Sequence, residues 1–199
     1  MSVYHAENVL PIEEKHALFN LICSDTFPWY YNASTAPKKY EVYGEEGGMT
    51  NSLETHQFTH TFFKNNKINS DFFHVIEPFF PIIDSIFNFK VIEIDRIKAN
   101  LMTPMVRNFN ETNPKHHDAD VCKDGRSLLS IIYYVNESDG DTILYNKEYP
   151  DQPNDLKEKH RIKPIENSMV VFPSTLYHAG SNPINFSRRI VLNFVLEVK

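Results

Sequence analysis

The sequence is poor in several residues whose abundance would mark a particular class of protein. Cys23 and Cys122 are its two cysteines, so a disulfide framework is not expected and a reducing compartment is favoured. The six glycines form no repeat, and no low-complexity tract is present. These shortages indicate an ordinary globular protein of 199 residues, for which we expect one domain.

Long apolar runs and an excess of basic residues are also missing. The most apolar window, residues 72–87, contains charged residues and two prolines and falls short of the roughly 20 apolar residues that span a bilayer. The N-terminus lacks a basic start followed by an apolar stretch, so we expect a cytoplasmic protein with no membrane contact. The net charge of −6 makes nucleic acid an unlikely partner, and the basic patch at residues 157–163 is interpreted as a solvated loop entering a strand.

Two N-terminal segments and five later ones carry the periodicities of secondary structure. Residues 11–23 and 70–87 have apolar residues at helical spacing, and the second segment is expected to break at Pro78 or Pro81. Residues 33–55 are predicted to form a long loop. Helices followed by strands predict a mainly β domain with flanking helices, a sandwich or jelly roll. The predicted strands are residues 91–102, 128–135, 142–145, 168–172 and 190–198.

A metal-binding pattern lies in the second half of the chain. Residues 115–118 read Lys-His-His-Asp, and in an extended segment His116 and Asp118 share a face while His117 points away. His178 follows a predicted strand end and completes a set of two histidines and one carboxylate. Such a set leaves three positions of an octahedral metal open, as in non-haem Fe(II) oxygenases.

The alternative for the His-x-Asp pair is a polar turn that matches by chance. Asp120 is left as an outer or surface carboxylate. If the histidines bind metal they must be neutral, so metal affinity is expected to fall below about pH 6.

Arg188 and Arg189 precede the last predicted strand and are candidates for binding a carboxylate. A buried guanidinium can hold a carboxylate by two parallel hydrogen bonds, as the distal end of 2-oxoglutarate would require. Arg189 shares a strand face with Val191 and Asn193, and the polar Asn193 indicates a polar pocket, so Arg189 is favoured over Arg188. The alternative for the pair is a cationic strand end at the surface.

Together these motifs resemble the Fe(II)/2-oxoglutarate-dependent dioxygenases, within them the prolyl-4-hydroxylase-like branch of bacteria and bacteriophages. The resemblance covers residue 97 to the C-terminus. It implies a double-stranded β-helix, a cupin-like jelly roll, at residues 91–199 of a single domain 1–199, with helices and a loop at 1–90. The motifs that carry it are Ile97-Lys-Ala-Asn-Leu, His116-x-Asp118, residues 129–136, Asp139-Gly-Asp-Thr-Ile-Leu, Asn167-Ser-Met-Val-Val-Phe, His178-Ala-Gly and Arg189-x-x-x-Asn193.

The resemblance also implies an activity and its site. Fe(II), 2-oxoglutarate and O2 would be used, with ascorbate as an optional addition. Tyr134 would contact the distal carboxylate of 2-oxoglutarate alongside Arg189, with Asn193 and Arg188 as further cosubstrate candidates. Asp118 favours hydroxylation, because related halogenases leave the carboxylate position empty for a halide. Two departures are Asp139-Gly140, where the family often has Gly-Gly, and the absence of a tyrosine around Met102.

The implied reaction is hydroxylation with release of succinate and CO2. The substrate, a peptide or small molecule, is first expected to be a peptidyl proline, then a metabolite or free amino acid, then a modified nucleobase. One alternative is a non-catalytic jelly-roll module that binds a metal or small ligand, which would not need the Arg189 carboxylate clamp. Another is a zinc hydrolase that uses the same three ligands and works without oxygen.

Overall fold

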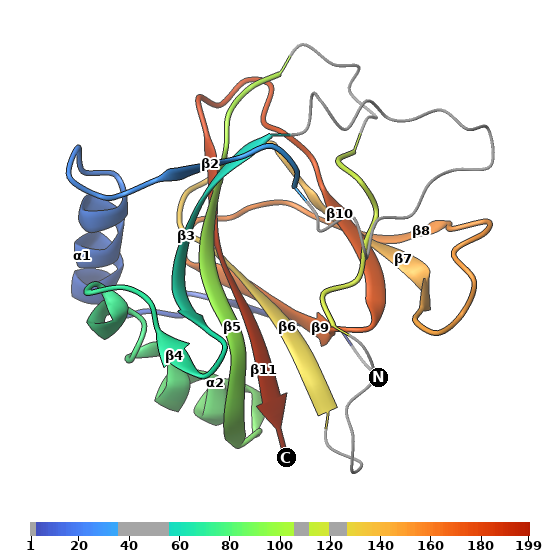
Figure 1. The fold of residues 1–199 in the computed structure, drawn as a ribbon, viewed down its shortest axis with the longest axis horizontal. Coiled ribbons are helices and arrows are strands. Elements are labelled where there is room, and N and C mark those ends of the chain that lie inside the picture. The colour runs from blue at the N-terminus through green and yellow to red at the C-terminus, as the bar shows by residue number, and fades with distance from the viewer. Residues whose placement is uncertain (1–2, 36–55, 106–111, 120–126) are drawn as a thin grey trace.

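The computed structural model describes residues 3–35, 56–105, 112–119 and 127–199. It consists mainly of two antiparallel sheets, with two helices against the larger one (Figure 1). This confirms the mainly β fold with flanking helices. The larger sheet has the order β1 (Tyr4–Glu7), β9 (Ser168–Pro173), β6 (Ser127–Tyr134), β11 (Arg189–Val198), β5 (Val91–Met102), β3 (Gln57–Lys64) and β2 (Tyr30–Asn32), and β4 (Lys67–Ile68) pairs with β3. The smaller sheet has the order β10 (Leu176–Gly180), β7 (Thr142–Glu148) and β8 (Glu158–Ile162).

The helices cover one face of the larger sheet, at the left and lower left of Figure 1. The first, α1 (Ile12–Ile22), coincides with the helix predicted at the N-terminus. The second, α2 (Phe79–Phe87), begins after Pro78, and a single 3-10 turn, η3 (Phe73–Val75), precedes it. The second predicted helix is therefore broken at Pro78, because proline is tolerated at a helix start but not in its interior. Within the described ranges no helix is long and apolar enough to cross a membrane.

The central strands send alternate side chains to opposite faces of the larger sheet. Beneath the helices, the Phe79 ring of α2 lies 5.2 Å from that of Phe194 and 4.8 Å from that of Tyr133. On the other face, Tyr134 packs with Leu144 of the smaller sheet. The helix-facing core includes Ile97 and Ala99 of β5, Ile131 and Tyr133 of β6, and Ile190, Leu192 and Phe194 of β11. The residues between them on β5 and β11, Lys98, Asn100, Met102, Arg189, Val191 and Asn193, line a cavity on the opposite face.

Several strands were not anticipated from the sequence. Residues 1–90, expected to hold helices and a loop, also contribute β1 to β4 to the larger sheet. The basic patch, expected to be a solvated loop entering a strand, is mostly strand β8, and its residues are largely exposed as predicted. His178 lies inside β10 rather than at a turn. Of the predicted loop at 33–55, residues 36–55 lie outside the described residues.

Asn167 anchors the chain between the first strand and helix α1. It has a positive φ of 61°. Its side-chain amide accepts from the Leu10 backbone N–H and donates to the Leu10 carbonyl, both at 2.9 Å, and accepts from the Tyr133 hydroxyl at 3.0 Å. These buried hydrogen bonds hold the segment before α1 against the start of β9.

We expect Asn167→Ala to lower the free energy of unfolding by about 3 kcal/mol, since it removes three buried hydrogen bonds and places alanine in a left-handed conformation. The matched control is Asn88→Ala, an exposed residue with a φ of 53°, which should lose only about 1 kcal/mol for the backbone conformation. Urea unfolding at neutral pH measures both. Equal losses would show that the Asn167 side-chain bonds contribute nothing.

Candidate metal and cosubstrate site

Backbone pairing brings the two segments of the metal-binding pattern together. His116 and His178 form an isolated antiparallel bridge, with each backbone N–H donating to the other's carbonyl at 2.9 and 2.8 Å. Asp118 is placed by its own N–H, which donates to the Ser174 carbonyl at 2.9 Å. One ligand atom from each of His116, Asp118 and His178 lies within 4.8 Å of the other two. The three predicted ligands therefore form one cluster.

The orientation of both imidazoles is set by neighbouring carbonyl groups. Nδ1 of His116 lies 3.0 Å from the Pro114 carbonyl, and Nδ1 of His178 lies 2.9 Å from the Leu176 carbonyl. Because a carbonyl can only accept, Nδ1 carries the hydrogen in each ring and Nε2 keeps its lone pair. This is the tautomer in which a histidine binds metal through Nε2 while Nδ1 holds the ring in place.

The Asp118 carboxylate is held by three side chains from the larger sheet. Its Oδ1 accepts from Arg96 Nη2 at 2.7 Å, and its Oδ2 accepts from Ser130 Oγ at 2.7 Å and weakly from Asn193 Nδ2 at 3.4 Å. His178 Nε2 lies 3.6 Å from the same Oδ2, which leaves space for an ion bound by both atoms. Two imidazole nitrogens and one carboxylate oxygen, each buried and oriented, fit a divalent transition metal.

Burial determines the protonation of these groups. It lowers the pKa of His116 to about 3 and also lowers that of His178, so both rings are neutral over a wider range than ordinary histidines. Burial alone would raise the pKa of Asp118, but Arg96 above all, with the two histidines and Lys98, holds it well below its usual range. The site is therefore ready to bind a cation at a lower pH than the limit of about 6 expected from the sequence.

This protonation predicts how the stability of the metal-free protein depends on pH. Between about pH 6.5 and pH 3 the unfolded chain protonates His116 while the folded protein does not, so the free energy of unfolding falls as pH falls. From pH 6.5 to 5 this one group accounts for up to about 2 kcal/mol. Urea unfolding of the metal-free protein should show a steeper loss for wild type than for His116→Gln. Parallel pH profiles would mean that the ring is not buried as a neutral group.

Arg189 lines the same cavity as the two histidines of the metal cluster, His116 and His178. The residue is 3% exposed; its Nε donates to the Gly140 carbonyl at 2.5 Å and its Nη2 to Thr142 Oγ1 at 2.7 Å. A Cβ added at Gly140 would come within 2.8 Å of Arg189 Cδ and 2.5 Å of the Ser181 carbonyl. Glycine is therefore required here for the guanidinium to approach the backbone. Asp139, the departure from Gly-Gly, accepts hydrogen bonds from the backbone of Ile184 and Asn185 before β11.

Tyr134 supports this end of the cavity from behind. Its hydroxyl donates to Thr142 Oγ1 at 2.8 Å, and its ring lies 5.9 Å from Arg189 Cζ. Burial raises the pKa of Tyr134 to about 12, so the hydroxyl keeps its proton. The Thr142 oxygen, which lines the cavity, accepts from both Tyr134 and Arg189, so its own hydrogen remains available to a ligand. Tyr134 itself is not among the residues that line the cavity.

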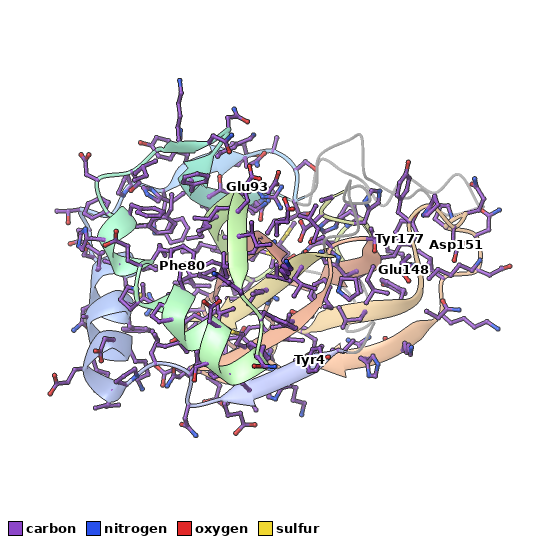
Figure 2. The ribbon with its side chains drawn as sticks, turned by 90° about the horizontal axis from the view of Figure 1, so that it is seen from below. Tyr4, Phe80, Glu93, Glu148, Asp151 and Tyr177 are labelled. Atoms are coloured by element: carbon purple, nitrogen blue, oxygen red, sulfur yellow. The ribbon has the colours of Figure 1, made fainter. Side chains whose placement is uncertain are left out.

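Arg188, the alternative to Arg189 as carboxylate ligand, and His117, the alternative to His116 as metal ligand, do not line the cavity. Arg188 points to the helix side of the sheet, with its guanidinium 5.6 Å from the Phe19 ring centre of α1. His117 stacks on Tyr149 at 4.7 Å and meets the Tyr177 ring edge at 5.6 Å. Figure 2 shows Tyr177 with Glu148 and Asp151 at the end of the molecule distant from Phe80 of α2. Asp120 lies outside the described residues.

Sequence reasoning missed four side chains that complete the site. Ser130 and Arg96 hold Asp118, and Thr142 joins Tyr134 to Arg189. Lys98 lines the cavity between the larger sheet and the histidines. The alternation of side chains along a strand could have indicated these residues. Arg96, Lys98 and Asn100 are polar and alternate along β5 with the apolar Ile97, Ala99 and Leu101.

A larger cleft borders Asp118 and Arg96. It has a volume of about 790 Å³, within the range of small-molecule binding sites. Charges of both signs line it, including Lys64, Glu93 and Glu197. Of the three cluster residues, His116 and His178 line the inner cavity that also contains Arg189, whereas Asp118 borders the outer cleft.

Comparison with known proteins agrees with this geometry. Residues 104–196 match the model of the 2OG-Fe(II) oxygenase superfamily. Similar solved structures include a prolyl-4-hydroxylase from Pseudomonas putida, with a TM-score of 0.56 and 13% identity, covering 98% of this chain and 91% of that one. A 2OG-Fe(II) oxygenase family oxidoreductase from Burkholderia pseudomallei has a TM-score of 0.62 and 11% identity, with coverage of 98% and 85%. The epimerase SnoN, in complex with Fe3+, alpha ketoglutarate and nogalamycin RO, has a TM-score of 0.58 and 11% identity, with coverage of 98% and 78%.

No curated protein matches the sequence significantly. The solved structures establish the fold, a jelly roll of the 2OG-Fe(II) oxygenase type. The family match relates residues 104–196 to the 2OG-Fe(II) oxygenase superfamily, and the solved structures of similar fold are oxygenases of the same kind. Enzymes of that superfamily use Fe(II), 2-oxoglutarate and O2, and the cluster of two histidines and one aspartate in this chain suits such a metal.

Proposed function

We propose that this chain is a single-domain hydroxylase in which His116, Asp118 and His178 hold Fe(II) and Arg189 holds the distal carboxylate of 2-oxoglutarate. The observation that carries the proposal is that the metal cluster and a buried, partly unpaired guanidinium open onto one cavity. His116, His178 and Arg189 all line it. An arginine placed in this way suits a dicarboxylate cosubstrate that reaches from the metal to the cavity end.

Each residue of the chain has a defined part in this reaction. When bound, Fe(II) with 2-oxoglutarate and O2 supplies an oxidation in which one oxygen atom enters succinate, the other converts a substrate C–H into C–OH, and CO2 leaves. Arg189 and the Thr142 hydroxyl bind the distal carboxylate. Arg96 and Ser130 keep Asp118 ionised and fixed. The apolar side chains Ile132 and Val191 line the cavity and limit the entry of water.

The substrate of this hydroxylation is a peptide or a small molecule. A peptidyl proline is supported by the prolyl-4-hydroxylase among the structures of similar fold. A small molecule is supported by SnoN, whose structure contains nogalamycin RO.

The test is anaerobic reconstitution with Fe(II) and 2-oxoglutarate, followed by admission of O2 and measurement of succinate. We expect succinate only when all three are present, and none when Zn(II) replaces Fe(II). Succinate formation that is independent of Fe(II) or O2 would contradict the proposal, and so would a hydrolytic activity of the zinc form.

A further inference from the structure

Arg96 of β5 contacts the metal ligand Asp118 through one carboxylate oxygen. Its Nη2 donates to Asp118 Oδ1 at 2.7 Å, and the two side chains are only 15% and 3% exposed. A buried hydrogen bond of this length between a guanidinium and a carboxylate is among the strongest polar contacts in a protein. The guanidinium therefore fixes Oδ1 in particular, in addition to neutralising the carboxylate.

The second oxygen of Asp118 has different surroundings. Oδ2 accepts from Ser130 Oγ at 2.7 Å and lies 3.6 Å from His178 Nε2, while the contact from Asn193 Nδ2 is long, at 3.4 Å. Because a carboxylate oxygen has two lone pairs, Oδ2 keeps one for a metal beside His178 while Ser130 occupies the other. Oδ1 could bind the same metal only if the carboxylate turned and broke its contact with Arg96. Only Oδ2 is thus placed to be a ligand.

The number of oxygens that Asp118 supplies decides how many metal positions stay open. Two histidines and one carboxylate oxygen leave three of the six positions of an octahedral metal. A 2-oxoacid that chelates through its keto and C1 carboxylate oxygens takes two of these positions and leaves one for O2. If both oxygens of Asp118 bound the metal, that last position would be filled. The contact between Arg96 and Oδ1 therefore bears directly on access of O2.

We propose, resting on the proposed function, that Arg96 is a positioning residue that makes Asp118 a one-oxygen ligand and so keeps a metal position open for O2. Any nearby cation would keep Asp118 ionised, but only a donor bound to Oδ1 stops that oxygen from binding the metal. Lys64 separates the two roles. It pairs with Arg96 across β3 and β5 and lines the same outer cleft, and within the described residues no hydrogen bond joins it to Asp118.

The experiment compares wild type with Arg96→Met in anaerobic binding of Fe(II) and then of nitric oxide, a probe of the position left for O2 once 2-oxoglutarate is bound. The variant loses a positive charge and frees Oδ1 for the metal, so its Fe(II) affinity should stay within about threefold of wild type or increase. Its nitric oxide affinity, followed by electron paramagnetic resonance, should fall at least about tenfold. Arg96→Lys keeps a charged donor and should recover part of this loss.

Two further variants separate this role from simpler ones. Lys64→Met removes a neighbouring positive charge and leaves the bond to Oδ1 in place. Ser130→Ala removes the bond to Oδ2 alone. Both variants should keep the nitric oxide affinity of wild type, although Ser130→Ala should weaken Fe(II) binding by about 10- to 100-fold, as the loss of a group that orients a ligand does.

Infrared spectroscopy tests the wild-type protein directly and decides the matter even if Arg96→Met does not fold. With carbon-13 in the aspartate carboxylates, Fe(II) binding should produce the wide separation of antisymmetric and symmetric stretches that one-oxygen coordination gives, and the separation should narrow in Arg96→Met. A narrow separation in wild type overturns the proposal. So does unchanged nitric oxide affinity or lost Fe(II) binding in folded Arg96→Met, or an equal loss of nitric oxide affinity in Lys64→Met or Ser130→Ala. Failure of wild type to bind Fe(II) would instead contradict the proposed function.

Discussion

His116→Ala is expected to abolish Fe(II)-dependent succinate formation and to weaken Fe(II) binding by more than about 100-fold, since even losses of groups that only orient a ligand weaken metal sites by 10 to 100-fold. The imidazole is one of three ligands, and its Nε2 is directed to the cluster by the Nδ1 bond to Pro114. Anaerobic Fe(II) titration and the succinate assay measure the two effects.

The adjacent histidine provides the matched control. His117→Phe keeps a ring stacked on Tyr149 and removes both ring nitrogens, so Fe(II) affinity should remain within about threefold of wild type. A loss of Fe(II) binding in His117→Phe equal to that in His116→Ala would overturn the ligand assignment. A thermal melt of each variant separates such a result from unfolding.

Arg189→Ala is expected to raise the KM for 2-oxoglutarate by about 100-fold or more, because removing one partner of a buried charge pair costs 2–5 kcal/mol. The effect should be specific to the distal carboxylate. With 2-oxobutanoate, which lacks that group, wild type and variant should therefore have similar KM values. The assay is the initial rate of cosubstrate consumption at varied concentration.

Arg188→Ala is the control for this variant, since Arg188 lies over Phe19 of α1 on the opposite face of the sheet. Its KM for 2-oxoglutarate should be close to that of wild type. If Arg189→Ala reduced the rate with both oxoacids equally, the residue would be stabilising the fold rather than holding the carboxylate.

Much of the fold could be predicted because the central strands have strong local patterns. The strand predicted at residues 91–102 coincides with β5, β9 and β11 differ from prediction by one residue at one end, and β6 is shifted by one residue at each end. β10 was missed because its five residues include His178 and pair with β7 about thirty residues away. β1 was missed because it is short and exposed at the sheet edge, where pairing with β9 stabilises it.

The sequence by itself determined which side chains share a face. The period of two in an extended chain separated His116 from His117 and Arg189 from Arg188, and the structure places the members of each pair in different surroundings. The same period also placed Arg96, Lys98 and Asn100 on one side of β5.

Only the tertiary structure decided which of these faces meet. The bridge between His116 and His178 joins segments sixty-two residues apart, and the Tyr134 hydroxyl is directed to Thr142 rather than into the cavity. Lys98 entered the site because β5 pairs with β11 beside Asp118, whose charge is already bound by Arg96. Periodicity is a property of neighbouring residues, whereas the partner of a charge depends on which distant strands pair and in which register.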